Sequence, residues 1–259
     1  MVVRKYMYLL YLSLKKMQIY KADFALNFIA IFIWIGAGIF NIAIFFCNTE
    51  SFGNWNLLET MLLYGMWTIT FAMYNILGSG LLEVENYIVT GNLDTILIKP
   101  ISPLLQILLS RINVMGVSFW IIGFLTIIYS LVKLQLKMSL GEIIFLVLSI
   151  ISGGLIIFSI YLVIASCSFW ILKTSSAIKI GYDIHKFVQY PIDVYGKGIK
   201  FILCTILPFA FSNYFPIAAL LHKVSYFWGG LSIGIAILVF LIAYGLWTLG
   251  LKKYEGSGA

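Results

Sequence analysis

The side chains able to do acid–base chemistry gather in one stretch of the sequence, which contains Asp183, His185 and Asp193. A lipid-modifying membrane enzyme needs such a cluster of acid, base or metal-binding groups facing the headgroup layer. On a helix, however, residues two apart point about 200° away from each other, so Asp183 and His185 would not share one site. This spacing makes an enzyme the least favoured function, and we expect no catalytic residue in the chain.

Motifs that bind nucleotides or metals are absent from the sequence. It has no GxxxxGK[ST] phosphate-binding loop and no HExxH motif, and His185 and His222 fall on opposite sides of the predicted membrane. The cysteines have no CxxC spacing, so we expect small buried apolar side chains rather than a disulfide or a metal site; they are Cys47, Cys167 and Cys204. We therefore expect no metal and no cofactor in this chain.

The carboxylates outside that stretch lie at the ends of apolar runs rather than in their middles. Glu59, Glu83, Glu85 and Glu142 are all placed in this way. Ion-driven carriers usually hold ionisable groups near the middle of the membrane, so this pattern counts against an ion-coupled secondary transporter. Backbone carbonyls at a broken helix can still bind sodium, so that carrier stays an alternative, as does a non-transporting membrane scaffold.

The elements that position these residues are membrane helices, because 62% of the chain is hydrophobic and only 10% is charged. A soluble domain needs far more polar surface. Continuous apolar runs of about 20 residues predict helices, whereas membrane strands alternate. We therefore predict an all-α integral membrane protein, a single transmembrane domain over 1–259 with six transmembrane helices, at about 24–47, 60–82, 112–132, 143–172, 201–221 and 224–251.

The fifth run differs from the others because Pro208 and Pro216 interrupt it. Proline removes a helix hydrogen bond and clashes with the preceding turn. Residues 201–223 can therefore form either a straight span or a broken, partly re-entrant one.

Lysine and arginine predict which way the helices face. Six spans put both termini and the loops after the second and fourth runs on one side, which we assign to the cytoplasm of a multi-pass cell-membrane protein. That side would hold fourteen basic residues and the other side three: Arg4, Lys5, Lys15, Lys16, Lys21, Lys99, Arg111, Lys173, Lys179, Lys186, Lys197, Lys200, Lys252 and Lys253 against Lys133, Lys137 and Lys223. The excess indicates attraction to lipid headgroups and not nucleic-acid binding.

Two amphipathic segments are predicted on the cytoplasmic side. Residues 1–23 carry an apolar and a basic face, which is typical of an interfacial helix. They have no small-residue cleavage site, so we do not expect them to be removed as a signal peptide. Residues 173–200 carry a polar stripe of Lys179, Asp183 and Lys186 at helical spacing.

The loop at 83–103 is too structured for a simple connection. Gly91 can end one helix in a left-handed conformation, and Asn92 or Asp94 can cap a new short helix with Leu93, Ile96 and Leu97 on one side. Pro100 ends that helix near Lys99. We expect a short, stiff surface helix between spans two and three that a partner protein contacts from the water side.

Aromatic side chains form a stripe on the second run. Tyr64, Trp67, Phe71 and Tyr74 recur at helical spacing. They either line a transport pathway or belong to the aromatic belts and lipid-facing surface that membrane helices usually carry.

Three stretches of this sequence resemble the permease subunits of bacterial type-2 ATP-binding-cassette (ABC) exporters. "ENYIVTGNLDTILIKPISPL" looks like their cytoplasmic loop, with its Gly-x-Leu-Asp run before a basic residue and proline. "FVQYPIDVYGKGIKFILCTILPFAFSNYFP" and the ending "GLKKYEGSGA" continue the likeness, which covers nearly the whole chain.

The resemblance implies a permease that forms its pathway as a dimer, with an identical or a related second chain, and exports a substrate the sequence leaves open. A pair of partner ATPase subunits would bind ATP and Mg²⁺. The coupling segment that docks on them would include Glu85, Gly91, Leu93, Asp94, Lys99 and Pro100. Pro208, Phe209 and Pro216 would lie in a broken helix near the external end of the pathway.

Overall fold

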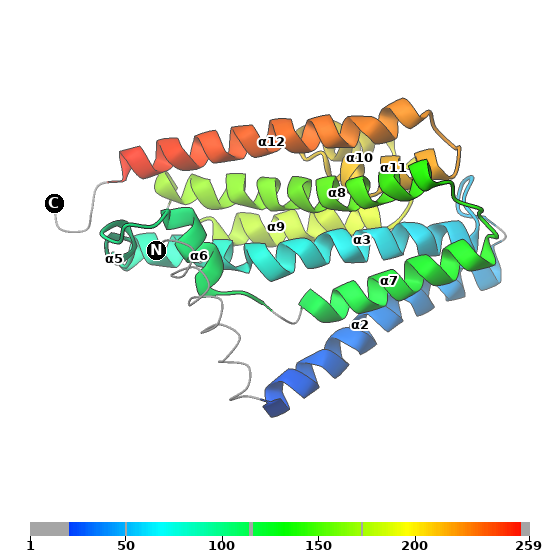
Figure 1. The fold of residues 1–259 in the computed structure, drawn as a ribbon, viewed down its shortest axis with the longest axis horizontal. Helices are drawn as coiled ribbons and strands as arrows, with labels where there is room; N and C mark the ends of the chain where they lie inside the picture. Colours follow the sequence, from blue (N-terminus) through cyan, green and yellow to red (C-terminus); the bar gives the residue numbers. More distant parts are fainter. Residues whose placement is uncertain (1–20, 50, 114–115, 172, 255–259) are drawn as a thin grey trace.

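The structure is a computed structural model that describes residues 21–49, 51–113, 116–171 and 173–254. In that part of the chain all regular secondary structure is helical (Figure 1). The long helices are α2 (Lys21–Asn48), α3 (Leu57–Gly78), α7 (Gly116–Lys133), α8 (Leu140–Ser166) and α12 (Tyr226–Lys253). The predicted interfacial helix at 1–23 falls almost entirely outside the described residues.

Four helical segments are long and apolar enough to cross a membrane. They lie at Phe28–Cys47, Gly116–Lys133, Leu140–Phe169 and Tyr226–Lys253. α3, which carries several Thr and aromatic residues, has the length of a span but is the central helix, with most of its side chains buried. An all-helical protein with apolar spans is therefore confirmed, and a smaller share of α2 than of the other spans is buried.

The long helices run side by side between two ends of the molecule (Figure 1). One end holds the short helix α5 (Leu93–Leu97) and the end of α12; we call it the α5 end. The other, the far end, holds the turns that join α2 to α3, α7 to α8, and α11 (Tyr214–Leu220) to α12. Capping boxes start two helices there, in which Asn56 and Glu59 cap α3 and Ser139 and Glu142 cap α8.

The segment 175–194 runs beside α3 from one end to the other. It comprises α9 (Ser175–His185), η3 (Lys186–Gln189) and η4 (Ile192–Val194). Its contacts with α3 follow one another in antiparallel order. The Tyr182 hydroxyl donates to that of Tyr74 at 3.1 Å, and Trp67 Nε1 donates to the His185 carbonyl at 3.1 Å. Trp55 Nε1, just before α3, donates to Asp193 at 3.3 Å.

This path corrects the prediction that 173–200 lies outside the bundle. The helix and its polar stripe were predicted correctly, but the opposite face of α9 is buried: Ile178, Gly181, His185 and, beyond the helix, Val188 pack inward. These small, apolar and aromatic side chains fit against α3 and α8, so burial places the segment inside the bundle.

The segment 197–221 enters the bundle from the far end and returns to it. It consists of α10 (Lys197–Phe201), a π-helical turn (Ile202–Ile206), η6 (Phe209–Ser212) and α11. Phe209 reaches His185, with ring centroids 4.9 Å apart, and Lys223 comes back to Glu59 at 3.0 Å. The break falls at Pro208, so the re-entrant alternative holds and the straight span at 201–221 is wrong.

Three lysines change place with this topology. Lys200 lies 3.6 Å from Asp193, so Lys197 and Lys200 belong to the far end and not to the side on which the sequence analysis placed them. Lys186 follows His185 in the sequence and lies beside the middle of α3. The three cysteines are free, but the prediction that they are buried is wrong, since Cys47 is exposed and Cys167 and Cys204 are half-buried.

Candidate functional site

The loop after α3 is a compact helical unit rather than a flexible connection. η1 (Ser79–Glu83) and α4 (Val84–Val89) continue α3, and α6 (Pro103–Ser110) follows α5. Gly91 has φ of +70°, the left-handed conformation that lets α4 end and α5 begin within a few residues. Asn92 takes the N-cap position of α5, but no side chain caps the helix, so the predicted capping by Asn92 or Asp94 does not occur.

Hydrogen bonds and close packing fix this unit internally. The side-chain amide of the buried Gln106 donates to the carbonyls of Ile96 (3.0 Å) and Ile101 (2.8 Å), which ties α5 to α6. Arg111 pairs with Glu83, so the end of α6 is joined to η1. Gln106 was not predicted as a site residue, although it is the only polar side chain in the apolar run PLLQILL.

α5 has one buried and one exposed side. Leu93 and Ile96 are buried, whereas Leu97, Ile98, Lys99 and Pro100 are exposed; we call these four residues the tip. Leu97 was predicted on the same side as Leu93, but it faces outward. Ile98 is 83% exposed, the largest value among the large hydrophobic side chains in the described ranges, so the tip presents an apolar surface beside one lysine.

Glu85 joins this unit to α9. Its Oε2 atom accepts backbone N–H groups of Thr174 (2.8 Å) and Ser175 (2.6 Å), which are the first amides of α9. A carboxylate at a helix N-terminus satisfies amides that have no partner within the helix and interacts favourably with the helix dipole. Glu85 therefore holds the start of the segment that runs along α3, an intramolecular contact rather than a surface one.

Asp94 faces the last described residue, Tyr254. Burial, and then the Asp94 carboxylate beside the hydroxyl, raises the pKa of Tyr254. Tyr254 also packs its ring against Phe169, with centroids 6.3 Å apart. The Gly-x-Leu-Asp run and the ending GLKKY, which are far apart in the sequence, thus meet at the α5 end. Tyr254 was not among the predicted site residues.

The aromatic stripe on α3 is buried. Tyr64, Trp67 and Phe71 are at most 8% exposed. Trp67 stacks on Phe71 at 5.6 Å, and His185 packs against both, at 5.5 and 5.3 Å. Trp67 and Phe71 therefore form the contact between α3 and α9, whereas the Tyr64 hydroxyl donates to the Ile35 carbonyl of α2 at 3.2 Å. The three predicted pathway residues line no open pathway in this conformation.

The structure separates the candidate acid–base residues. His185 is buried among aromatic rings, and its Nε2 has no hydrogen-bond partner. Asp183 is exposed and pairs with Lys186 at 2.7 Å, and Asp193 lies at the far end with Trp55. No group of three His, Cys, Asp or Glu side chains that could hold a metal ion occurs within the described residues.

Asp183 lies beside the middle of α3 and not at an end of the bundle. It precedes His185 by two residues, and the His185 carbonyl meets Trp67 in the middle of α3. The prediction assigned Asp183 to a cytoplasmic helix outside the apolar runs.

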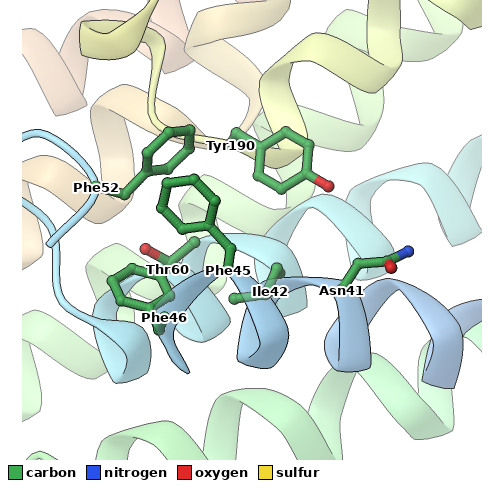
Figure 2. Close-up of a pocket in the computed structure, with 7 residues that line it drawn as sticks. All are labelled: Asn41, Ile42, Phe45, Phe46, Phe52, Thr60 and Tyr190. Carbon is green, nitrogen blue, oxygen red and sulfur yellow. The ribbon is translucent and has the colours of Figure 1, made fainter. Parts of the chain in front are cut away.

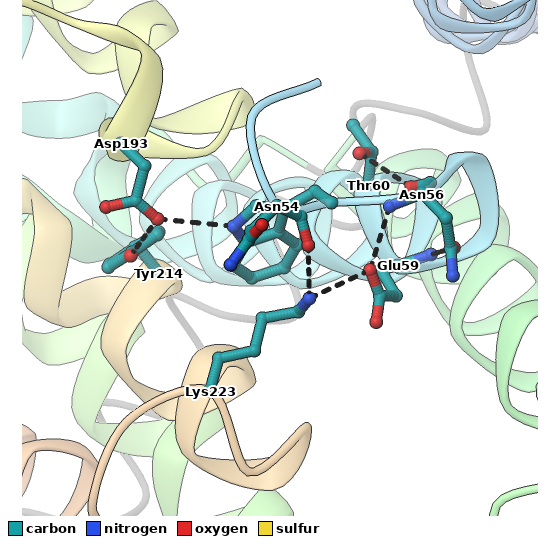
Figure 3. A network of polar contacts seen from close by, with 8 residues as sticks. Asn54, Asn56, Glu59, Thr60, Asp193, Tyr214 and Lys223 are labelled. Carbon is teal, nitrogen blue, oxygen red and sulfur yellow. Dashed lines mark hydrogen bonds and ion pairs between the residues drawn. The ribbon is translucent and has the colours of Figure 1, made fainter. Parts of the chain in front are cut away.

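A polar network holds the re-entrant segment at the far end (Figure 3). Asp193 accepts from both Trp55 Nε1 and the Tyr214 hydroxyl. Lys223 donates to the Asn54 carbonyl and pairs with Glu59. Of the residues predicted in the broken helix, Phe209 reaches the middle of the bundle, while Pro208 marks the break and Pro216 lies within α11.

A small pocket lies beside this network. It has a volume of about 160 Å³ and lies between α2, the α2–α3 turn and the 175–194 segment (Figure 2). Its lining is mostly aromatic and includes Asn41, Phe45, Phe52, Thr60 and Tyr190. The Phe45 and Phe52 rings are 4.5 Å apart, and Phe52 meets Tyr190 at 6.1 Å.

Comparison with protein-family models gives a match over most of the chain. The family model described as ABC-2 family transporter protein matches residues 32–258. No curated protein and no solved structure matches the chain. The family model covers all but the first 31 residues and the last one, including α5, the 175–194 segment and the re-entrant segment, so the chain belongs to the ABC-2 family of transporter proteins, a family of membrane permeases.

Proposed function

We propose that this chain is the permease subunit of an ATP-driven ABC exporter and that its coupling segment, residues 83–103, docks on separate ATPase subunits. The observation that carries the proposal is the tip, an exposed apolar surface on a helix that is fixed to the rest of the chain. An apolar side chain as exposed as Ile98 at an end of the bundle is favourable when a partner covers it.

The same coupling segment has two contacts through which motion can pass into the bundle. Glu85 holds the N-terminus of α9, and Asp94 lies beside Tyr254 at the end of α12. Closure of an ATPase pair on ATP would move α5, and these contacts would carry the displacement to both helices. ATP can shift the equilibrium between the open and closed ATPase pair only by the difference in its affinity for these two states. A flexible coupling segment would not transmit that free-energy difference to the membrane helices.

The proposed topology has six crossings, with the α5 end in the cytoplasm of a bacterial cell. The crossings are α2, α3, α7, α8, the segment 175–194 and α12, so both termini lie on the α5 side. After Lys21 the two ends carry five positive residues each: Lys99, Arg111, Lys173, Lys252 and Lys253 at the α5 end, and Lys133, Lys137, Lys197, Lys200 and Lys223 at the far end. The positive residues that favour this orientation are those that precede or begin α2 on the proposed cytoplasmic side, Arg4, Lys5, Lys15, Lys16 and Lys21.

In this proposal the energy comes from a partner subunit, since the sequence of this chain has no phosphate-binding loop. ATP and Mg²⁺ would be bound by the ATPase pair, and a second permease, identical or related, would complete the pathway. In the proposed topology Asp183 lies mid-span, which gives an ion-coupled carrier a candidate site and makes it the second candidate function.

The complex itself tests the function. We expect the chain, extracted from its native membrane in mild detergent, to co-purify with an ATPase that carries the GxxxxGK[ST] motif, and reconstituted vesicles to require ATP for transport. Purified permease that transports alone in response to a proton or sodium gradient would instead establish the ion-coupled carrier.

A further inference from the structure

The face of the 175–194 segment that points away from α3 and α8 carries polar and charged side chains together with two exposed apolar ones, Ile180 and Phe187. Ser176, Lys179, Asp183 and Lys186 are all exposed on it. Asp183 and Lys186 neutralise each other in an ion pair of 2.7 Å, in which the side chains remain 70% and 51% exposed. Lys179 makes no ion pair with any residue that the structure describes. Each chain therefore presents one balanced pair and one excess positive charge.

This face lies at membrane depth in the proposed topology, on which the inference rests. Asp183 and Lys186 flank His185, whose carbonyl accepts from Trp67 halfway along α3. Lys179 lies about one helical turn from Asp183, toward the α5 end. Charged side chains within the hydrocarbon are costly and normally face water or a polar partner. The charged side chains of this face therefore do not suit contact with lipid tails.

The carboxylates on the helices that pack against this segment do not neutralise Lys179. Glu59 on α3 pairs with Lys223, and Glu142 on α8 caps its own helix, both at the far end. Glu85 is bound to the first amides of α9. A second copy of the chain, related by a two-fold axis along the membrane normal, would bring a second lysine to the same depth, because identical residues face each other across such an axis.

We propose that this face lines a water-filled pathway between two permease copies and that the pathway takes a polar solute carrying negative charge, such as a phosphate or carboxylate group. Lys179 from each copy attracts the anion on the cytoplasmic side. The Asp183–Lys186 pairs farther along offer hydrogen bonds without adding net charge. Two positive charges facing a narrow aqueous space raise the local concentration of anions relative to cations.

Charged thiol reagents test both parts of the proposal. In a full-length permease with Cys47, Cys167 and Cys204 replaced by serine, single cysteines would be introduced by Ser176→Cys and Phe187→Cys, both at exposed positions of this face. The control is Val147→Cys, an exposed position among apolar residues of α8. The probes are the anionic reagent methanethiosulfonate ethylsulfonate and the cationic reagent methanethiosulfonate ethyltrimethylammonium, applied to inside-out vesicles with and without the ATPase.

We expect both face positions to react and Val147→Cys to stay unreactive. At Ser176→Cys the anionic reagent should be favoured, and adding Lys179→Gln should lower the anion-to-cation rate ratio about fivefold, because the charge lies about one turn away. Unreactive face positions, or disulfides that join the cysteines of two copies and close the face, would overturn the aqueous pathway. A rate ratio that Lys179→Gln leaves unchanged would overturn the anion preference. The labelling rates can be measured without ATP. The pathway can therefore be supported when no ATPase co-purifies with the permease, and it can be refuted when an ATPase does co-purify.

Discussion

Ile98→Asp is expected to release the ATPase subunits from the permease while leaving the permease folded. Ile98 is 83% exposed, so a carboxylate there costs the isolated subunit little. In the complex the same side chain would enter an apolar site on the ATPase. Central apolar contacts of this kind are worth about 2 kcal/mol, or roughly a 30-fold loss of affinity, and a buried unpaired charge adds to that. Quantitative co-purification at several ATPase concentrations measures the loss.

The matched control for Ile98→Asp is Leu140→Asp. Leu140 is 75% exposed, but it begins α8 at the far end, where an acidic residue also suits the helix dipole. We expect this variant to bind ATPase like the unmodified chain. Leu93 would be a poor choice for the same experiment because its side chain is fully buried, so that a lysine there would disrupt α5 itself. Equal ATPase binding by Ile98→Asp and Leu140→Asp would remove the tip from the proposed interface.

Glu85→Ala is expected to separate ATP hydrolysis from movement of the membrane helices. The substitution leaves the tip intact, so the ATPase should remain bound and active. It removes the acceptor for two backbone amides of α9, with an expected cost of about 1–3 kcal/mol at this contact. The start of α9 would then no longer follow α5. We expect ATP-driven transport to fall at least tenfold while ATP hydrolysis changes less than twofold.

The movement can be followed without knowing the substrate. In the cysteine-free background, the reactivity of Lys197→Cys at the far end should change on ATP binding in the unmodified complex and stay constant when Glu85→Ala is added. Glu142→Ala is the control, since Glu142 also caps a helix but lies at the far end, away from the coupling segment. Loss of the ATP response in both variants would indicate general instability, and retention in Glu85→Ala would show that motion passes by another route.

The short helix within the coupling segment was predicted because its signals are local. A glycine that takes positive φ and a proline that follows the helix act on the residues beside them, so the sequence correctly placed the helix between Gly91 and Pro100. The roles within the segment were harder to predict. Glu85 and Asp94 find partners about 90 and 160 positions along the chain, at Ser175 and Tyr254, and no local pattern specifies such pairs.

The path of residues 175–194 was the largest error, and it has a physical reason. A stripe of Lys179, Asp183 and Lys186 predicts a helix with one polar face, which is correct. It does not say whether that face meets bulk water or a polar surface within an assembly. Hydrophobicity pointed to the apolar run at 201–221 as the span, yet its prolines make it re-entrant, and the less apolar helix runs beside α3 instead.

A photo-reactive amino acid placed at position 98 tests the central claim most directly. The coupling segment is proposed to contact the ATPase through the tip, so irradiation of intact cells should link the permease covalently to an ATPase subunit. The same photo-reactive residue at position 140 should give no such product. Adducts with the ATPase from position 140 but not from position 98, or from neither in cells where the two proteins co-purify, would contradict the account.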